Sequence, residues 1–420
     1  MMKKNTIPAL GLLILIPLTI IFSDKILIPM DLTQTDHLKA YGIAYRALQA
    51  GENIEWLLNY RGGSFLADYY SRLEKDCALS GVRWETVKSS DVLQIYQTIQ
   101  DNNMETMLLE KAPRIAVYIP HNNEPWDDAV TLALEYAGIP YDRIWDEEVL
   151  NDKLTKYDWL HLHHEDFTGQ YGKFYGAYHT SEWYQQEVKV NMEMARKLGF
   201  KKVSRMKLAV AWAIKEYVKK GGFIFSMCSA CDTYDIGLAA QNTDIDHAVF
   251  DGDPVDPQAQ QKLDFSQTFA FENFQVILDP LVYEHSTIDV TQEAGIRGPN
   301  AYFALFDFSA KFDPVPTMLV QDHTALVKEF MGQCTGFRRA TLKPSVLILA
   351  DVSGTEEIKY LHGNYGKGTF TYLGGHDPED YQHMVLDPPT DLNLYKNSPG
   401  YRLILNNVLF PAARKKELKT

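Results

Sequence analysis

A strand-to-helix turn in the middle of the chain decides the fold. It reads Gly221-Gly222-Phe223-Ile224-Phe225-Ser226-Met227-Cys228-Ser229-Ala230. The apolar run 223–227 predicts a buried strand, and the glycine pair before it ends a helix predicted over 206–219. Cys228 then stands where the strand meets a helix that begins near residue 230. A nucleophile on such a turn projects from the edge of a sheet, and the helix N-terminus favours its thiolate.

Strands and helices alternate on both sides of this turn. The predicted strands are 114–119, 141–145, 157–163, 223–227, 346–349 and 368–373. The predicted helices are 126–137, 182–198, 206–219 and 401–409. This alternation predicts an α/β fold with a mostly parallel sheet that carries helices on both faces. Because ligands of such sheets bind at the carboxyl ends of strands, the position of Cys228 is informative.

The alternation also divides the chain into parts. Residues 24–110 predict a small N-terminal α/β unit, and residues 111–412 predict the main domain. Within the main domain, residues 241–340 lack the strand–helix period and predict an insertion or lid of loops and short strands. In the small unit, the predicted helices are 37–49, 66–75 and 91–100, and the predicted strands are 54–58 and 82–87.

A second motif supplies a base for the predicted nucleophile. It reads Gly366-Lys367-Gly368-Thr369-Phe370-Thr371-Tyr372-Leu373-Gly374-Gly375-His376-Asp377-Pro378-Glu379. The pattern predicts a strand with His376 at its carboxyl end. A cysteine nucleophile needs a base, and the base needs an acceptor that orients it. His376 could be the base, with either Asp377 or Glu379 as the acceptor.

The order of these two motifs resembles the class I glutamine amidotransferase-like proteins over about residues 113–412. The resemblance implies a flavodoxin-like sheet, a Cys228 nucleophile, a His376 base and an acidic third member. It also implies an oxyanion site formed in part by the backbone N–H of Ser229. A second donor would lie in the loop after the strand 157–163, where His164 and Glu165 are candidates for substrate contact.

A second resemblance covers the whole chain. Three segments are similar to bacterial proteins labelled asparagine synthetase B, namely residues 37–42, 56–65 and 161–170. That enzyme needs a cysteine directly after the initiating methionine, and position 2 is Met2. It also needs a Ser-Gly-Gly-x-Asp-Ser pyrophosphate loop, which the sequence lacks. The label therefore does not imply synthetase activity here.

Three alternative sites stay open. Cys228-Ser229-Ala230-Cys231 is a Cys-x-x-Cys pattern, which is typical of redox or metal sites. Arg61-Gly62-Gly63 could hold an anion or contact substrate. A dense polar run after the strand 157–163 could instead hold zinc for hydrolysis. Its members are His161, His163, His164, Glu165 and Asp166. The favoured interpretation of this run is a polar strand end lining the same cleft as Cys228, with no metal and no cofactor.

Charge and the N-terminus indicate the location and partners. The net charge is −14 without a long basic block, which argues against nucleic-acid binding. Lys3 and Lys4 precede an uncharged run over 7–22. Residues 1–23 therefore predict a secretory signal, or a membrane anchor if uncleaved, and export to the periplasm. Four cysteines in 420 residues do not form a disulfide scaffold.

Two functions of different classes follow from the sequence. The first is a Cys-dependent amidase or related acyl hydrolase of a small polar substrate, with backbone donors holding the oxyanion. The second is a non-catalytic envelope binding protein of the same fold, whose aromatic-rich cleft and 241–340 insertion hold a glycan or peptide.

Overall fold

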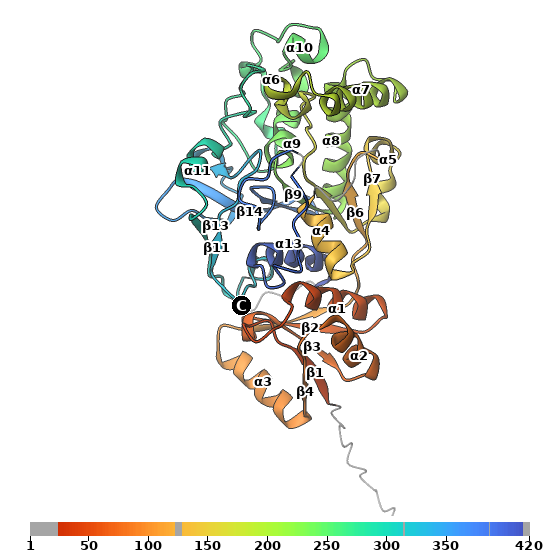
Figure 1. Ribbon diagram of the computed structural model, residues 1–420, viewed down its shortest axis with the longest axis vertical. Helices are drawn as coiled ribbons and strands as arrows, with labels where there is room; N and C mark the ends of the chain where they lie inside the picture. The colour runs from red at the N-terminus through yellow and green to blue at the C-terminus, as the bar shows by residue number, and fades with distance from the viewer. Residues whose placement is uncertain (1–23, 122–127, 314–315, 386, 415–420) are drawn as a thin grey trace, which may run out of the picture.

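The computed structural model describes residues 24–121, 128–313, 316–385 and 387–414, which form two β-sheets with helices between and around them (Figure 1). The N-terminal sheet has the order β4-β1-β3-β2-β5, and all of its pairings are antiparallel. Its strands are β1 (Lys25–Ile28), β2 (Ile54–Leu58), β3 (Ser64–Asp68), β4 (Glu85–Val87) and β5 (Glu105–Leu109). Its helices are α1 (His37–Gln49), α2 (Ser71–Ser80) and α3 (Ser89–Asp101).

Most predicted elements of this unit are confirmed, and one is wrong. Helix 37–49 and strand 54–58 occur with the predicted bounds. The predicted helix 66–75 is instead strand β3 followed by α2. β3 pairs with β1 on one side and β2 on the other, so backbone pairing within the sheet overrides local helix preference.

The second sheet has two halves of different character. Its order is β11-β10-β13-β14-β15-β9-β8-β6-β7, with β12 beside β14. The parallel half comprises β6 (Ile115–Tyr118), β7 (Asp142–Ile144), β8 (Trp159–Leu162), β9 (Phe223–Met227) and β15 (Gly368–Leu373). The antiparallel half comprises β10 (Tyr302–Leu305), β11 (Leu326–Lys328), β12 (Phe337–Arg338), β13 (Leu347–Asp351) and β14 (Glu357–Tyr365).

The expectation of a mostly parallel sheet is therefore corrected to a mixed one. β15 pairs in parallel with β9 but antiparallel with β14, and the tight turn from Tyr365 to Gly368 makes β14 and β15 a hairpin. Residues 241–340, expected as an insertion or lid, contribute β10, β11 and β12 to the antiparallel half. Because antiparallel neighbours need no crossover helix between them, the strand–helix period is lost in residues 241–340.

Helices cover both faces of the second sheet (Figure 1). Helices α4 (Ala129–Ala137) and α13 (Pro399–Leu409) cover one face, where they pack with Trp159 of β8 and Phe225 of β9. Helices α5 (Asp146–Leu150), α8 (Val203–Lys220) and α9 (Ala230–Ala239) cover the other face, where they pack with Leu160 of β8 and Ile224 of β9. Outer helices are α6 (Tyr175–Tyr178), α7 (Glu182–Lys197), α10 (Ala248–Asp251) and α11 (Thr291–Arg297). The short α12 (Pro316–Leu319) is buried and packs against α13.

One hydrophobic core joins the two sheets. α1 contacts α4 and α13, so it lies between the N-terminal sheet and the main sheet. At the far side of the junction, Glu110 N–H donates to Ala412 O at 3.0 Å and Arg414 N–H donates to Leu108 O at 2.9 Å. Residues 412–414 thus lie along the outer edge of β5.

The N-terminal signal or anchor predicted for residues 1–23 lies outside the described residues. Among the helices of the described residues, none combines the length and the apolar character needed to cross a bilayer.

Candidate metal centre

Strands β8, β9 and β15 of the parallel half end side by side, and each is followed by a functional side chain. His163 and His164 follow β8, Cys228 follows β9, and His376 comes three residues after β15 ends. Backbone hydrogen bonds lock these strand ends together. Cys228 N–H donates to Gly375 O at 3.0 Å, and Ala230 N–H donates to His163 O at 2.9 Å. The carboxyl edge therefore collects the residues that the sequence singles out.

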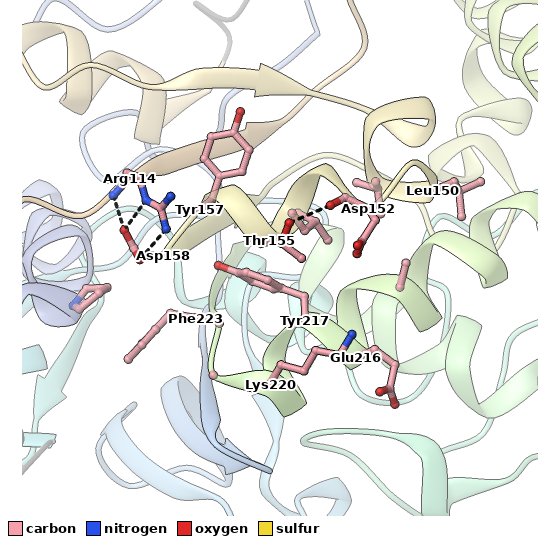
Figure 2. Close-up of a pocket in the computed structure, with 16 residues that line it drawn as sticks. Arg114, Leu150, Asp152, Thr155, Tyr157, Asp158, Glu216, Tyr217, Lys220 and Phe223 are labelled. Carbon is pink, nitrogen blue, oxygen red and sulfur yellow. Dashed lines mark hydrogen bonds and ion pairs between the residues drawn. The ribbon is translucent and has the colours of Figure 1, made fainter.

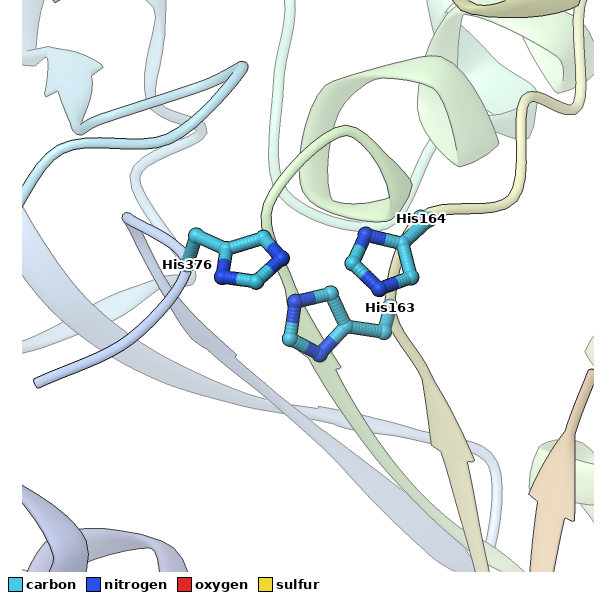
Figure 3. A group of neighbouring side chains, drawn as sticks. All are labelled: His163, His164 and His376. Atoms are coloured by element: carbon cyan, nitrogen blue, oxygen red, sulfur yellow. The ribbon is translucent and has the colours of Figure 1, made fainter. Parts of the chain in front are cut away.

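Three imidazoles meet at this edge (Figure 3). One ring nitrogen each of His163, His164 and His376 lies within 4.8 Å of the others. The ring centroids of His163 and His164 are 4.0 Å apart, and each lies 4.7 Å from the centroid of His376. His163 and His376 are buried, so the cluster belongs to the interior of the edge and not to its solvated rim.

Asp128 orients His163. Its Oδ1 lies 3.2 Å from Nδ1 of His163, and its Oδ2 lies 3.0 Å from Nε2 of His161. The same carboxylate caps α4 by accepting from the backbone N–H of Val130 at 2.7 Å. With Nδ1–H directed at Asp128, Nε2 of His163 carries a lone pair, and it is buried without a hydrogen-bond partner. A carboxylate behind an imidazole is the usual support of a metal-binding histidine.

His376 presents a second unsatisfied nitrogen. Its Nδ1 is buried and has no hydrogen-bond partner. The ring of His383 stacks on it with centroids 4.4 Å apart, and Nδ1 of His383 lies 3.0 Å from a carboxylate oxygen of Asp380. Because buried polar atoms in folded proteins are nearly always paired, the unpartnered Nε2 of His163 and Nδ1 of His376 call for an explanation. Nε2 of His376 faces the other two imidazoles, and its Nδ1 lies on the opposite side of the ring (Figure 3).

The cluster is electrostatically suited to a cation. Burial, and then the neighbouring His164, lowers the pKa of His163 to about 4. Burial, and then His163 and His164, holds the pKa of His376 well below its ordinary range. Both rings are therefore neutral near pH 7, and neutral imidazole is the form that binds metal. Asp128 stays anionic: burial opposes its charge, but His161 and His163 hold its pKa well below the usual value.

The backbone of Cys228 has the strained conformation expected of a nucleophile on a tight turn, but its surroundings favour the neutral thiol over the thiolate. Its φ of 52° lies in the left-handed region, which non-glycine residues rarely adopt outside special sites. Its sulfur accepts a hydrogen bond from the backbone N–H of Gln333 at 3.3 Å. Burial nevertheless raises the pKa of the thiol to about 12. Across the described ranges no hydrogen bond joins Cys228 to His376, whose ring contacts His163 and His164 instead.

The two carboxylates expected to orient His376 bond elsewhere. Asp377 accepts from Glu379 N–H at 2.9 Å and from the Thr390 hydroxyl at 2.8 Å. Burial raises the pKa of Glu379, and a hydrogen bond with Ser398 partly offsets this. The orienting carboxylate of the cluster is Asp128, which the sequence analysis missed. Its sequence signal is an Asp at the start of a helix that follows a buried strand.

The expected oxyanion and substrate residues lie in different places. Ser229 is at the cluster, where its hydroxyl donates to His164 O at 2.8 Å. Glu165 is near the cluster in sequence but pairs with the buried Lys207 at 3.2 Å. Arg61 belongs to the N-terminal unit and pairs there with Asp31 at 2.7 Å and Glu85 at 2.8 Å. The anion-binding role considered for Arg61 would have to displace these two carboxylates.

Of the three alternatives left open by the sequence, the histidine run matches the observed geometry best. His163 and His164 lie beside His376, which the sequence analysis expected to be the base of the Cys228 thiol. His161 is not in this group, and its Nε2 contacts the carboxylate of Asp128. The Cys-x-x-Cys pattern is less well placed. Cys228 and Cys231 are both unpaired and buried, and the thiol of Cys231 faces Leu373 O at 3.7 Å.

A roomy hollow lies at the opposite edge of the same strands (Figure 2). It measures about 500 Å³ and is lined by residues at the strand starts, among them Arg114, Asp158 and Phe223. Arg114 and Asp158 pair with each other at 3.1 Å. Ligands of open α/β sheets bind at the carboxyl ends of strands, which is the edge of the histidine cluster and not of this hollow.

Comparisons with known proteins do not identify the chain. No family model matches it, and no curated protein matches it either. Similar solved structures include a cytoplasmic protein of Salmonella typhimurium, with 11% identity and a TM-score of 0.35 over 72% of this chain and 100% of that one. A ThuA-like protein from Bacteroides uniformis has 11% identity and a TM-score of 0.28 over 70% and 92% of the two chains. A β-galactosidase from Bacillus circulans has 12% identity and a TM-score of 0.26 over 74% and 33%.

Likenesses of this size carry no argument about activity. What stands is a mixed α/β fold with a large mixed sheet. The expected glutamine amidotransferase-like class remains a prediction, and the resemblance to proteins labelled asparagine synthetase B finds no match among these comparisons.

Proposed function

We propose that the protein is a metal-dependent hydrolase of a small polar substrate, with a divalent ion such as zinc held by His163, His164 and His376. One observation carries the proposal: one ring nitrogen each of His163, His164 and His376 lies within 4.8 Å of the others, and Nε2 of His163 is buried without a hydrogen-bond partner. Imidazole nitrogen is a common ligand of zinc in proteins.

The ligand number favours catalysis over a structural role. Structural zinc sites close four protein ligands around the ion, whereas catalytic sites use three and leave one position open. Cys228 is not among the described residues whose ligand atoms join the cluster. A metal with three imidazoles supplies an activated water or polarises a carbonyl. Asp128 fixes the tautomer of His163, and Ser229 fixes the backbone of His164 by donating to its carbonyl.

Metal analysis tests the proposal directly. We expect the purified full chain, stripped with a chelator and reloaded, to retain one zinc or cobalt ion per chain. The variants His163→Ala and His376→Ala should each lose at least ten-fold in metal affinity. His179→Ala is the matched control, because His179 is exposed on the surface at the end of α6.

The same preparations test the chemistry. Turnover of a p-nitrophenyl ester should require the reloaded metal and should be lost with it in the His163→Ala and His376→Ala variants. Absence of stoichiometric metal in the folded chain would end the proposal. Metal binding without metal-dependent turnover would reduce it to a metal-binding protein, the class of the non-catalytic alternative.

A second candidate function is acyl transfer by Cys228, as expected from the amidotransferase-like resemblance. The left-handed backbone of Cys228 at the start of α9 favours it. The raised pKa of the thiol opposes it. Iodoacetamide at pH 7 distinguishes the two: rapid alkylation at Cys228 that abolishes turnover supports the thiol. A Cys228→Ser variant with unchanged metal-dependent turnover supports the metal-dependent mechanism. Export through residues 1–23 stays part of either proposal.

A further inference from the structure

Four carboxylates gather between the start of α8 and the loop around α10, and we call them the aspartate cluster. Its members are Asp244, Asp246, Asp251 and Asp253. One carboxylate oxygen each of Asp244, Asp246 and Asp251 lies within 4.8 Å of the others. α10 lies at the end of the molecule remote from the N-terminal sheet (Figure 1). None of the four residues belongs to the histidine cluster.

A side-chain cation already lies among these carboxylates. Nζ of Lys202, the residue before α8, is 2.7 Å from Oδ2 of Asp244 and 2.7 Å from Oδ2 of Asp251. It is also 2.9 Å from Oδ2 of Asp253. The other oxygen of Asp244 accepts from Asp246 N–H at 3.0 Å, which fixes the carboxylate in the loop. The side chain of Lys202 is 22% exposed, so this long, flexible chain can turn out to solvent and free the position.

The carboxylates carry more charge than the cations beside them balance. Lys202 and Arg205 are positive, but Arg205 directs its guanidinium to backbone carbonyls. It donates to Gln241 O and to Thr243 O, each at 3.1 Å. Four ionised carboxylates against these two cations leave two negative charges in excess. A divalent cation supplies the charge that is missing.

Asp246 is the buried member of the aspartate cluster, and one of its oxygens is unsatisfied. It is 1% exposed, and its Oδ1 has no hydrogen-bond partner among the described residues. Burial raises the pKa of Asp246 well above its ordinary value, against a hydrogen bond from Ser204. A buried carboxylate without a partner is costly unless a cation compensates it.

A hollow of about 20 Å³ lies beside Asp246. A single water or ion needs about 10–15 Å³, so the hollow has room for one. Its polar lining residues are Thr168, Ser204, Arg205, Thr243, Asp244 and Asp246. The room next to the buried carboxylate is therefore lined mainly by oxygen-bearing side chains.

We propose that the aspartate cluster binds one calcium ion, which takes the place of the Lys202 ammonium and is held by Asp244, Asp246 and Asp251. Oxygen donors without nitrogen or sulfur suit hard cations such as calcium. Two oxygens bonded to one calcium ion lie at most about 5.2 Å apart, and the observed spacing of 4.8 Å or less satisfies this limit. Since Gln170 donates to Ile245 O at 3.0 Å, the ion would also steady the segment after β8. The site is independent of the metal at the histidine cluster.

Calorimetric titration of the chelator-treated full chain with calcium chloride tests the proposal. We expect one calcium ion per chain with a Kd below about 1 mM, weaker binding of magnesium, and a calcium-dependent rise in melting temperature. Asp246→Asn should weaken calcium binding at least ten-fold. Because this variant removes a buried charge at constant size, the melting temperature of the calcium-free protein should not fall. His163→Ala should leave calcium affinity within two-fold.

A second variant tests the position of the ion. Lys202→Met removes the competing ammonium and should tighten calcium binding at least three-fold. Lys262→Met is the matched control, because Lys262 pairs with Asp256 outside the aspartate cluster, and it should change the affinity less than two-fold. Any of four results would overturn the proposal: no saturable calcium binding, unchanged binding in Asp246→Asn, weaker binding in Lys202→Met, or tighter binding of magnesium than of calcium.

Discussion

The two edges of the parallel half-sheet differ in what they leave unpaired. The amino edge has the roomier hollow, but its charged residues Arg114 and Asp158 satisfy each other (Figure 2). The carboxyl edge is tightly packed, yet it buries nitrogens of His163 and His376 that have no partner (Figure 3). The comparison teaches that the empty volume and the unsatisfied polar atoms lie at opposite edges of the sheet, and the proposed metal site follows the unsatisfied atoms.

The largest expected effect comes from Asp128, the carboxylate behind the histidines. Asp128→Ala removes the partner of two buried histidines and the cap of α4, and we expect about 3–5 kcal/mol of lost stability in chemical denaturation. Asp128→Asn keeps a capping oxygen and should lower metal affinity by about 10–100-fold. Asp36→Ala removes the corresponding cap of α1 and also the acceptor of the Tyr136 hydroxyl, so it should cost about 2–3 kcal/mol without changing metal affinity.

Acid should weaken the same edge. The unfolded state protonates His163 near pH 6.5, whereas the folded state resists protonation until about pH 4. Between these values the unfolded chain binds more protons, so the free energy of unfolding falls as pH falls, by up to about 3 kcal/mol from this residue. Other buried groups titrate in the same window, so the measurement is the difference between the metal-free wild type and His163→Gln. Parallel pH profiles would contradict the assigned burial of His163.

A substitution at the amino edge should lower the stability of the fold without changing metal binding. A Cβ on Gly222 would lie 2.2 Å from the ring of Tyr217, so Gly222→Ala overpacks the start of β9. We expect a loss of about 1–3 kcal/mol in thermal or chemical unfolding. Metal stoichiometry of the folded fraction should be unchanged. A loss of metal in this variant would show that the two edges are coupled through β9.

The smallest effect should come from the ion pair of the amino-edge hollow. Arg114 is half exposed, and exposed pairs contribute about 0–1 kcal/mol. Arg114→Ala should therefore leave metal affinity and ester turnover within two-fold of the wild type. A ten-fold fall in turnover would reverse the comparison and place substrate at the amino edge.

The parallel half could be predicted well from the sequence because its strands carry local signals. β9 and β15 occur with the predicted bounds, since apolar runs bounded by glycine are typical of strands buried on both faces. In the antiparallel half the predicted strand 346–349 is confirmed as β13 (Leu347–Asp351), but the other strands there were not predicted. β14, with nine residues, was missed because its buried Lys359 and His362 break the apolar pattern. Their partners, such as Glu329 for Lys359, lie far away in sequence.

The candidate site was predicted in position but not in composition. The strand-end rule correctly brings Cys228, His163, His164 and His376 to one edge. Which of these side chains contact one another depends on the orientation of the imidazole rings and on Asp128. Asp128 lies in the connection between β6 and α4, which the sequence analysis did not consider. Sequence spacing carries no information about which imidazole turns toward which neighbour. The family resemblance assigned His376 to the thiol, and the observed ring contacts assign it to the other histidines.

The segment 412–414 along β5 has a consequence for biosynthesis. An uncovered edge strand offers unpaired backbone groups to any other chain that can align with it. β5 is translated long before the residues that shield it. The nascent polypeptide therefore exposes this strand edge until residues 412–414 have been made and have docked on it.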